Sequence, residues 1–273
     1  MHIALNYSPQ AAALLNQGTI KLDYYKVPDW PDMVGTASAQ LPVYVHWPLM
    51  AGRHNGKQVG WEQIAALHDQ TATPYINTHL APRASDFAGM PLDTTHLEHT
   101  RNLIEAMHDD IRQLVDRFGA AQVILENATW DPTYEIPRPV LEAECICQMV
   151  NDTGAGFLLD IAHARIAASY LGVDPQTYIA SLPVDRLREL HVTGVIYDTK
   201  QNRLNDHFPM TAADWSLTEW ALGQIHSGAW ATPWVVALEY GGVGAGFSER
   251  SDASVIAIDI PRLYQLVKPT SVN

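Results

Sequence analysis

Short apolar runs recur along the chain, and most of them are followed by a segment with helical spacing. The runs are brief, rich in β-branched or aromatic residues and largely apolar on both faces, which is typical of parallel strands that are buried on both sides. The eight predicted strands cover residues 2–7, 20–26, 42–46, 74–79, 122–126, 156–160, 187–192 and 234–239.

The segments between these strands carry apolar residues three and four positions apart, which is the period of an amphipathic helix. One helix is expected to begin at Asp174-Pro175, because an aspartate cap followed by proline favours the first helical turn. The other predicted helices cover residues 59–70, 97–118, 139–151, 211–224 and 251–267.

Eight strands, with helical patterns in most of the gaps between them, predict a closed (β/α)8 barrel, the TIM barrel. A doubly wound open sheet is the alternative, but that fold usually has a glycine-rich turn after its first strand, and Tyr7-Ser8-Pro9-Gln10 contains no glycine. Such barrels often use about 250 residues as one unit. The chain has 273 residues and no linker that would separate two cores, so we expect residues 1–273 to form a single α/β barrel domain.

The composition narrows the class of protein. Hydrophobic residues make up 47% and charged residues 17%, which excludes a disordered chain. A net charge of −13 without any Lys/Arg cluster repels phosphate backbones and makes nucleic acid a poor partner. Two cysteines, Cys145 and Cys147, are too few for a disulfide framework or a four-cysteine zinc site. We expect a cytoplasmic protein without a membrane partner, because we find no signal peptide and no run approaching the ~18 apolar residues of a membrane span.

The last six predicted strands each end with, or carry near the end, a side chain that can bind a metal. Carboxyl ends of barrel strands meet at one rim, so we expect these groups to converge. Three carboxylates in one cavity would repel each other, and bound cations would relieve that repulsion; histidine with carboxylate suits zinc, iron or manganese. The six side chains are His46, His79, Glu126, Asp160, His191 and Glu239.

Two further ligand candidates lie just beyond strands. His163 follows Asp160 by three residues, so both groups could reach one metal if the chain turns into a helix there. Asn205-Asp206-His207 follows the seventh strand across a loop. In an extended segment residues 205 and 207 share a face and residues 206 and 207 do not, so either Asn205 or Asp206 could join His207.

The ordered phrases PVYVH, INTHL, VILEN, LLDIAH, ELHVTG, NDH and LEY resemble the xylose isomerase-like TIM barrels. Within these, the chain is most similar to the multinuclear non-haem iron-dependent oxidases, which include the methanobactin-biosynthesis oxidase and related peptide-modifying enzymes. The similarity covers nearly the whole chain. It implies two or three divalent metal ions at the barrel mouth, with iron as the expected metal and zinc or manganese as alternatives.

By position, the resemblance carries eight ligands over to this sequence: His46, His79, Glu126, Asp160, His163, His191, His207 and Glu239. The chain departs from the family pattern twice. The family usually has asparagine where this chain has His163, and the D-x-x-H that results resembles the trinuclear zinc site of endonuclease IV. The family also usually has D-x-H where this chain reads Asn205-Asp206-His207, which leaves Asn205 and Asp206 as alternatives for one ligand.

Four functions are compatible with this set of residues. The resemblance implies an iron oxidase that uses dioxygen on a peptide or small-molecule substrate, and a partner protein often delivers the peptide. The runner-up is a sugar or sugar-phosphate isomerase or epimerase, in which Glu126 and Glu239 would bridge metals or transfer protons. The others are an endonuclease IV-like zinc phosphodiesterase and a binding protein without turnover. We expect Glu126, Glu239 and His207 to be catalytic, and Asp206 to join the metal ligands.

Overall fold

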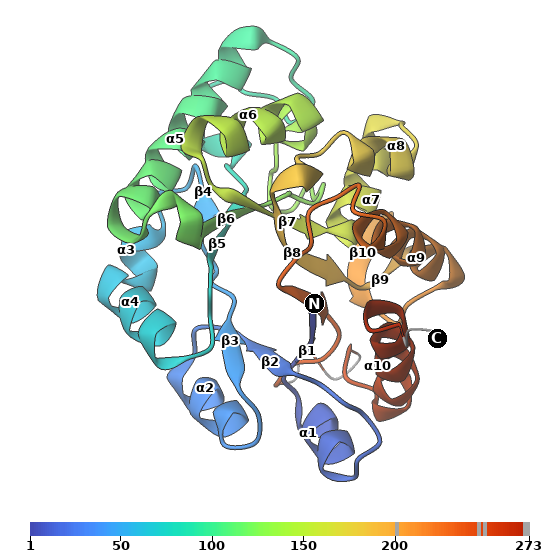
Figure 1. Ribbon diagram of the computed structural model, residues 1–273. Helices are drawn as coiled ribbons and strands as arrows, with labels where there is room; N and C mark the ends of the chain where they lie inside the picture. The colour runs from blue at the N-terminus through green and yellow to red at the C-terminus, as the bar shows by residue number, and fades with distance from the viewer. Residues whose placement is uncertain (200–201, 245–246, 248–249, 270–273) are drawn as a thin grey trace.

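The computed structural model describes residues 1–199, 202–244, 247 and 250–269. At its centre lies a nine-stranded, wholly parallel sheet that curls around an axis, with helices on its outer face (Figure 1). The strand order is β3-β2-β1-β11-β8-β7-β6-β5-β4. These strands are β1 (His2–Asn6), β2 (Tyr24–Val27), β3 (Val43–Val45), β4 (Met50–Ala51), β5 (Ile76–Leu80), β6 (Val123–Glu126), β7 (Gly156–Asp160), β8 (Leu187–Val192) and β11 (Val235–Leu238).

The two ends of this order, β3 and β4, belong to one continuous segment. β3 pairs with β2, and the amide of His46 just beyond it donates to the carbonyl of Val27 over 2.8 Å. β4 pairs with β5, and the carbonyl of Leu49 accepts from the amide of His79 over 2.9 Å. The segment therefore closes the sheet, and the (β/α)8 barrel expected from the sequence is confirmed.

The predicted third strand is confirmed as β3, and Pro48 separates it from the short strand β4, which was not predicted. Proline has no amide hydrogen, so the ladder cannot run through it. The preceding amide, that of Trp47, donates instead to the side-chain oxygen of Asn77 over 2.8 Å. The predicted second strand is also shorter than expected, and only Tyr24–Val27 pairs. The other seven predicted strands, including β3, agree with the structure to within two residues at each end.

The helices lie around the barrel and bury their apolar stripes against it (Figure 1). The longest, α5, buries Leu103, Met107, Ile111 and Leu114 at four- and three-residue intervals, and each such side chain contributes roughly 1.5–3 kcal/mol. The helices are α1 (Pro9–Asn16), α2 (Pro31–Ser38), α3 (Gly56–Val59), α4 (Trp61–Gln70), α5 (Leu97–Phe118), α6 (Ala143–Thr153), α7 (Ile161–Leu171), α8 (Pro175–Ala180), α9 (Ala212–His226) and α10 (Ala253–Val267), with 3-10 turns η1 (Ala84–Asp86), η2 (Ala120–Gln122), η3 (Arg138–Leu141) and η4 (Val184–Arg186).

Two predicted helices start later than expected. The helix predicted over 59–70 is α4, which starts at Trp61 because Gly60 has a φ of +92°, outside the helical region. The second starts later than expected, because η3 precedes α6. Asp174 caps α8 through the amide of Thr177 as predicted, over 2.8 Å. Within the part of the chain that the structure describes, none of the helices combines the length and the hydropathy needed to span a bilayer.

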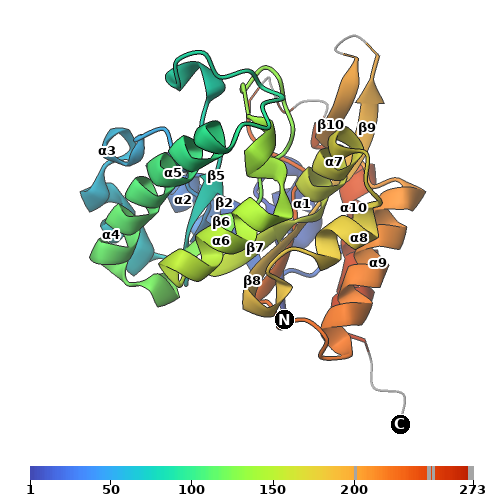
Figure 2. The same cartoon turned by 90° about the horizontal axis from the view of Figure 1, so that it is seen from above.

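A hairpin that the sequence pattern did not predict rises from one end of the barrel. Its strands, β9 (Gly194–Asp198) and β10 (Arg203–Phe208), pair antiparallel directly after β8. Figure 2 shows it projecting from the end of the barrel opposite to the N-terminus. At its base, a Cβ on Gly194 would overlap the carbonyl oxygens of Phe208 and Pro209, so only glycine allows this close approach of two backbones.

Candidate metal centre

The barrel brings the side chains expected at the rim into one cluster. Glu126 ends β6 and Asp160 ends β7, while His79 and His191 lie near the ends of β5 and β8. The register places His79 beside Glu126 and Asp160 beside His191 at the same level of the barrel. The remaining members stand on the loops or elements just above: His46, His163, Asp206, His207 and Glu239.

Glu126 is the centre of this cluster. Its Oε2 lies 3.1 Å from His79 Nε2 and 3.5 Å from His46 Nε2. Its Oε1 lies 3.5 Å from His163 Nδ1 and 4.0 Å from His191 Nδ1. Only 1% of the Glu126 residue surface is exposed, and burial raises the pKa of its carboxyl to about 8. A buried carboxylate with histidines on both oxygens is suited to bridging two cations.

A second carboxylate group forms around His191. Its Nδ1 lies 2.9 Å from Glu239 Oε1 and 4.0 Å from Asp160 Oδ2. The opposite nitrogen, Nε2, lies 2.8 Å from Glu189 Oε1. Burial holds the pKa of His191 well below its usual range, so the ring is neutral. A neutral ring that donates from Nε2 to Glu189 presents the Nδ1 lone pair to Glu239 and Asp160.

Three more histidines have their orientation fixed by a backbone carbonyl. The Nδ1 atoms of His79, His163 and His207 lie 3.0 Å from the carbonyl oxygens of Leu49, Asn127 and Glu239, respectively. A carbonyl can only accept, so each Nδ1 is the donor. Neutral rings held in this way keep an Nε2 lone pair for a ligand, which is the usual arrangement of metal-binding histidines.

The charge states of these rings differ without a metal. Burial lowers the pKa of His79 to about 3 and that of His46 well below its usual range. Burial alone would lower the pKa of His163 too, but the carboxylates of Asp160, Asp206 and Glu126 outweigh it and raise the value to about 10. In the metal-free protein a protonated His163 therefore supplies positive charge among the carboxylates.

The bulge in β10 sets where Asn205 and Asp206 point. The register shifts between Asn205 and Phe208, and His207 adopts a left-handed φ of +61°. The simple alternation of faces is broken there, so Asp206 and His207 both reach the cluster. Asp206 Oδ2 lies 3.2 Å from His163 Nε2, whereas Asn205 donates to Asp198 over 3.2 Å. The structure thus brings Asp206 to the cluster and leaves Asn205 outside it.

The cluster passes a test of fit for divalent cations. Among the described residues, Glu126 Oε2, Asp160 Oδ2 and His191 Nδ1 are buried and have no hydrogen-bond partner. Leaving such atoms unsatisfied costs roughly 1–3 kcal/mol each, and more for charged groups. In each of three groups of residues, one ligand atom per residue lies within 4.8 Å of the others. The groups are His46, Glu126 and His191; Glu126, Asp160 and His163; and Asp160, His191 and Glu239. Cations at these places would satisfy all three atoms.

Sequence reasoning missed two charged residues that belong to this cluster. Lys26 in β2 is only 6% exposed and forms an ion pair with Glu239. Burial lowers the pKa of Lys26 to about 8. Glu189 stands two positions before His191 in the same strand and contacts it directly. Both left a signal, because a charged residue inside a strand that is otherwise buried on both faces needs a partner.

A cavity of about 350 Å³ opens above the cluster. His79, His163, Asp206 and His207 line it, and its wall includes Tyr134, Ile136 and Ile166. The histidines and Asp206 therefore face a space that can hold a substrate. The remaining sequence-predicted ligands lie deeper and do not line it: His46, Glu126, Asp160, His191 and Glu239.

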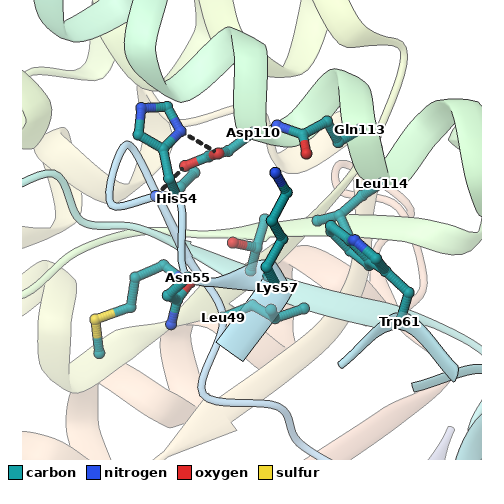
Figure 3. Close-up of a pocket in the computed structure, with 12 residues that line it drawn as sticks. Leu49, His54, Asn55, Lys57, Trp61, Asp110, Gln113 and Leu114 are labelled. Atoms are coloured by element: carbon teal, nitrogen blue, oxygen red, sulfur yellow. Dashed lines mark hydrogen bonds and ion pairs between the residues drawn. The ribbon is translucent and has the colours of Figure 1, made fainter. Parts of the chain in front are cut away.

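A smaller cavity of about 150 Å³ lies beside β4 and α5, with Lys57 and Trp61 on its wall (Figure 3). Asp110 of α5 accepts hydrogen bonds from the amides of Gly52 and His54 over 2.8 Å, and from the His54 ring over 2.7 Å. His54 has a left-handed φ of +52°, so Asp110 stabilises a turn that is otherwise unfavourable. The pair of Asp110 and His54 therefore has a structural role.

Solved structures confirm the fold. The chain superposes on an AP endonuclease of family 2 from Brucella melitensis with a TM-score of 0.59, covering 95% of this chain and 98% of that one at 12% identity. It superposes on a sugar phosphate isomerase/epimerase from Parabacteroides distasonis with a TM-score of 0.56, covering 98% and 100% at 12% identity. At such identities the likeness concerns the barrel fold alone.

Sequence relatives give the family. A UPF0276 protein of Bordetella pertussis is 30% identical over 245 residues, which cover 80% of each chain. A UPF0276 protein of Caulobacter vibrioides is 33% identical over 205 residues, covering 71% of this chain and 69% of the relative. Residues 30–232, which carry all the candidate ligands except Glu239, match the family described as RiPP precursor modification enzyme MbnB/TglH/ChrH. The chain therefore belongs to the MbnB/TglH/ChrH family of RiPP precursor modification enzymes, as the resemblance noted in its sequence implied.

Proposed function

We propose that this protein is a multinuclear non-haem iron oxidase that modifies a peptide. The observation that carries the proposal is the tethering of four histidines, His79, His163, His191 and His207. An outer acceptor takes one ring N–H of each, so that the other nitrogen faces buried carboxylates. A ligand set of imidazole and carboxylate suits iron as well as zinc and manganese. Family membership favours iron and a peptide substrate, because the precursor of a RiPP is a peptide.

The proposed ligands would hold metal at different depths of the cluster. Glu126 would hold metal together with His46 and His79, which lie near its Oε2, and with His163, which lies near its Oε1. Glu239 would bind an inner ion together with His191 and Asp160. Asp206 and His207, delivered by the hairpin, would hold or adjust an ion next to the cavity. Bound ferrous iron would supply the reduction of dioxygen and the oxidation of a substrate carbon.

The chain's own residues prepare the site for this chemistry. Glu189 and the carbonyls of Leu49, Asn127 and Glu239 fix the ring orientations before any metal arrives. Apolar residues such as Ile136 and Ile166 on the cavity wall limit water around the substrate. Preorganised ligands next to a partly apolar cavity favour oxidation of a bound substrate over reaction with solvent.

The test is elemental analysis of protein purified anaerobically without a His tag, followed by dioxygen consumption with a peptide. Two or more equivalents of iron, and dioxygen consumption that requires the peptide, are the expected results. Three equivalents of zinc with phosphodiesterase activity would contradict the proposal in favour of an endonuclease IV-like enzyme. One or two equivalents of manganese, cobalt or magnesium with aldose–ketose exchange would favour the isomerase alternative, in which Glu126 and Glu239 act on protons.

The matched variants are Glu126→Gln and Glu142→Gln. The first replaces the carboxylate at the centre of the cluster, and the second replaces a glutamate on the outer surface at the start of α6. We expect Glu126→Gln to lose at least one equivalent of metal while its circular dichroism spectrum stays unchanged, and Glu142→Gln to keep the full content. Full metal content in both variants would count against the assignment of Glu126.

A further inference from the structure

The cavity above the metal cluster carries more positive charge than the rest of this acidic protein would suggest. The chain has 17 lysines and arginines against 30 acidic residues. Three of the arginines line this one cavity: Arg53, Arg203 and Arg250. The acidic residues that line it are Asp131 and Asp206. The average composition of the chain does not explain why arginines outnumber acidic residues in this cavity.

Both acidic residues already have partners. Asp131 forms an ion pair with Arg203 and accepts from the amide and hydroxyl of Thr133 over 2.7 and 2.6 Å. Asp206 faces His163 Nε2 at 3.2 Å and belongs to the proposed metal ligands. In the part of the chain that the structure describes, Arg53 and Arg250 are therefore the arginines of this cavity that form no direct ion pair with a carboxylate.

Arg53 is held in place by neutral groups. Its Nε donates to the carbonyl of Ala81 and its Nη2 donates to the carbonyl of Tyr134 over 3.0 Å. Two carbonyls fix the plane of the guanidinium but do not neutralise it, and Nη1 keeps both hydrogens for another acceptor. The side chain is half-buried, so water compensates its charge only in part.

Arg250 lines the same cavity and lies against Phe208 of the hairpin. Its guanidinium carbon lies 5.7 Å from the centre of the Phe208 ring. Among the described residues, neither Arg250 nor Arg53 has a carboxylate within ion-pair distance. Two half-buried guanidinium groups with no carboxylate within ion-pair distance among the described residues line a cavity of about 350 Å³ and form a place for an anion that is brought by a ligand.

We infer that Arg53 and Arg250 form a subsite that binds a carboxylate of the substrate. The inference rests on the proposed function, because a peptide substrate carries carboxylates at its C-terminus and on its aspartate and glutamate side chains. A guanidinium binds a carboxylate through two parallel hydrogen bonds and so fixes its orientation as well as its position. With the carboxylate held at the mouth, the neighbouring part of the peptide lies between the subsite and His79, His163 and His207.

The test uses three capped peptides and zinc-loaded protein, in which no oxidation takes place. The peptides are acetyl-Ala-Ala-Ala with a free C-terminal carboxylate, the same peptide as the C-terminal amide, and acetyl-Ala-Asp-Ala amide, which has only a side-chain carboxylate. We expect one of the two acidic peptides to bind about tenfold more tightly than the neutral amide by calorimetry, since a charged hydrogen bond is worth at least that factor. The tighter acidic peptide identifies the source of the carboxylate.

The variants separate the arginines from the metal as the origin of this preference. Arg53→Met, Arg250→Met and the double variant should each lower the affinity for the acidic peptide, and the double variant should bind acid and amide equally. The matched control is Arg112→Met, an exposed arginine on α5 outside the cavity. Because Arg53 also supports two backbone carbonyls, Arg250→Met provides a test that does not depend on that loop.

Two outcomes would overturn the inference. One is equal affinity of the unmodified protein for all three peptides, including no binding at all. The other is a preference for acid that persists in the double variant, which would mean that the carboxylate binds the metal instead. The zinc content of each variant is measured in parallel. A protein that binds no metal would contradict the proposed function, whereas acid discrimination by its metal-free form would still report on the two arginines.

Discussion

His191 donates from Nε2 to Glu189 Oε1 over 2.8 Å, and both side chains are buried inside the barrel on the same strand. Residues two apart on a strand share a face, so β8 itself holds this pair in register. The contact makes Nδ1 the free nitrogen of His191, and Nδ1 is the atom that faces Glu239 and Asp160. A carboxylate behind a metal-binding histidine fixes the ring and increases its basicity.

Replacing this carboxylate should weaken metal binding without removing a ligand. Glu189→Gln keeps an oxygen that can accept from His191 Nε2 but removes the negative charge behind the ring. We expect the affinity for one metal equivalent to fall by about 10–100-fold, the range seen when such outer partners are changed. A competition titration with a chelating dye measures it. Glu219→Gln, at an exposed ion pair with Arg262, serves as the control, and equal affinities in the two variants would rule out this role of Glu189.

Lys26 should stabilise the metal-free protein more than the metal-loaded one. Its ammonium pairs with Glu239 next to a ring of buried carboxylates, so Lys26→Met leaves Glu239 without its cation. Breaking a buried ion pair from one side costs roughly 3–5 kcal/mol. A metal bound to Glu239 would replace the lost charge and offset much of that loss.

Thermal unfolding with and without metal measures the difference. The expected result is that metal raises the Tm of Lys26→Met by several degrees more than it raises the Tm of the unmodified protein. Lys21→Met, which changes an exposed lysine just before β2, should leave that gain unchanged. If the metal-dependent gain is the same for Lys26→Met and Lys21→Met, Lys26 does not compensate the charge of the cluster.

The sequence predicted the positions of the strands better than the paths between them. Seven strands and the long helix α5 follow from local apolar runs. The geometry of a parallel barrel then explains the convergence of His46, His79, Glu126, Asp160, His191 and Glu239. The break at Pro48 could have been read from the proline, whereas the pairing that closes the barrel on both sides of it involves residues far apart in the chain.

The hairpin could not be predicted from the local sequence pattern. Simple alternation pairs Asn205 with His207, and a bulge at His207 overrides it. The bulge depends on the pairing of Phe208 with Gly194, which no reading of residues 203–208 alone contains. Lys26 and Glu189 were visible as charges within buried strands, but their partners, Glu239 and His191, became identifiable only when the barrel fixed which faces point inward.

A pH-dependent effect is expected at Asp259 in α10, away from the metal cluster. Burial raises the pKa of this carboxyl to about 6, and its Oδ2 is a buried atom without a hydrogen-bond partner. The folded state therefore holds a proton that the unfolded state releases between about pH 4 and pH 6. Over that interval this group makes folding less favourable as the pH rises, and the penalty is fully present above pH 6.

Asp259→Asn removes the penalty, because an amide needs no ionisation. We expect the free energy of unfolding at pH 7.5 to rise by about 1–3 kcal/mol relative to the unmodified protein, and the difference to shrink towards zero near pH 4. Urea unfolding at both pH values measures it. Asp69→Asn, at an exposed position on α4, should change stability little at either pH. A benefit of Asp259→Asn that is as large at low pH as at pH 7.5 would contradict this account.

The hairpin should bring its two proposed ligands, Asp206 and His207, to the cluster only while Gly194 allows the backbones to meet. A Cβ at this position would overlap the carbonyls of Phe208 and Pro209, which are rigid parts of the main chain. Gly194→Ala should therefore displace β10 and move Asp206 and His207 away from His163. The deeper ligands stand on barrel strands that do not depend on β10, so part of the metal should remain bound.

The expected result for Gly194→Ala is the loss of about one equivalent of metal, measured by elemental analysis, with the circular dichroism spectrum of the barrel retained. Gly223→Ala is the matched control, because Gly223 lies inside α9 and a Cβ there meets nothing within 4 Å. Alanine at a helical position free of contacts stabilises by roughly 0.5–1 kcal/mol and should leave the metal content unchanged. Full metal content in Gly194→Ala would show that the centre does not need Asp206 and His207, and would restrict the ligands to those on the barrel strands and on α7.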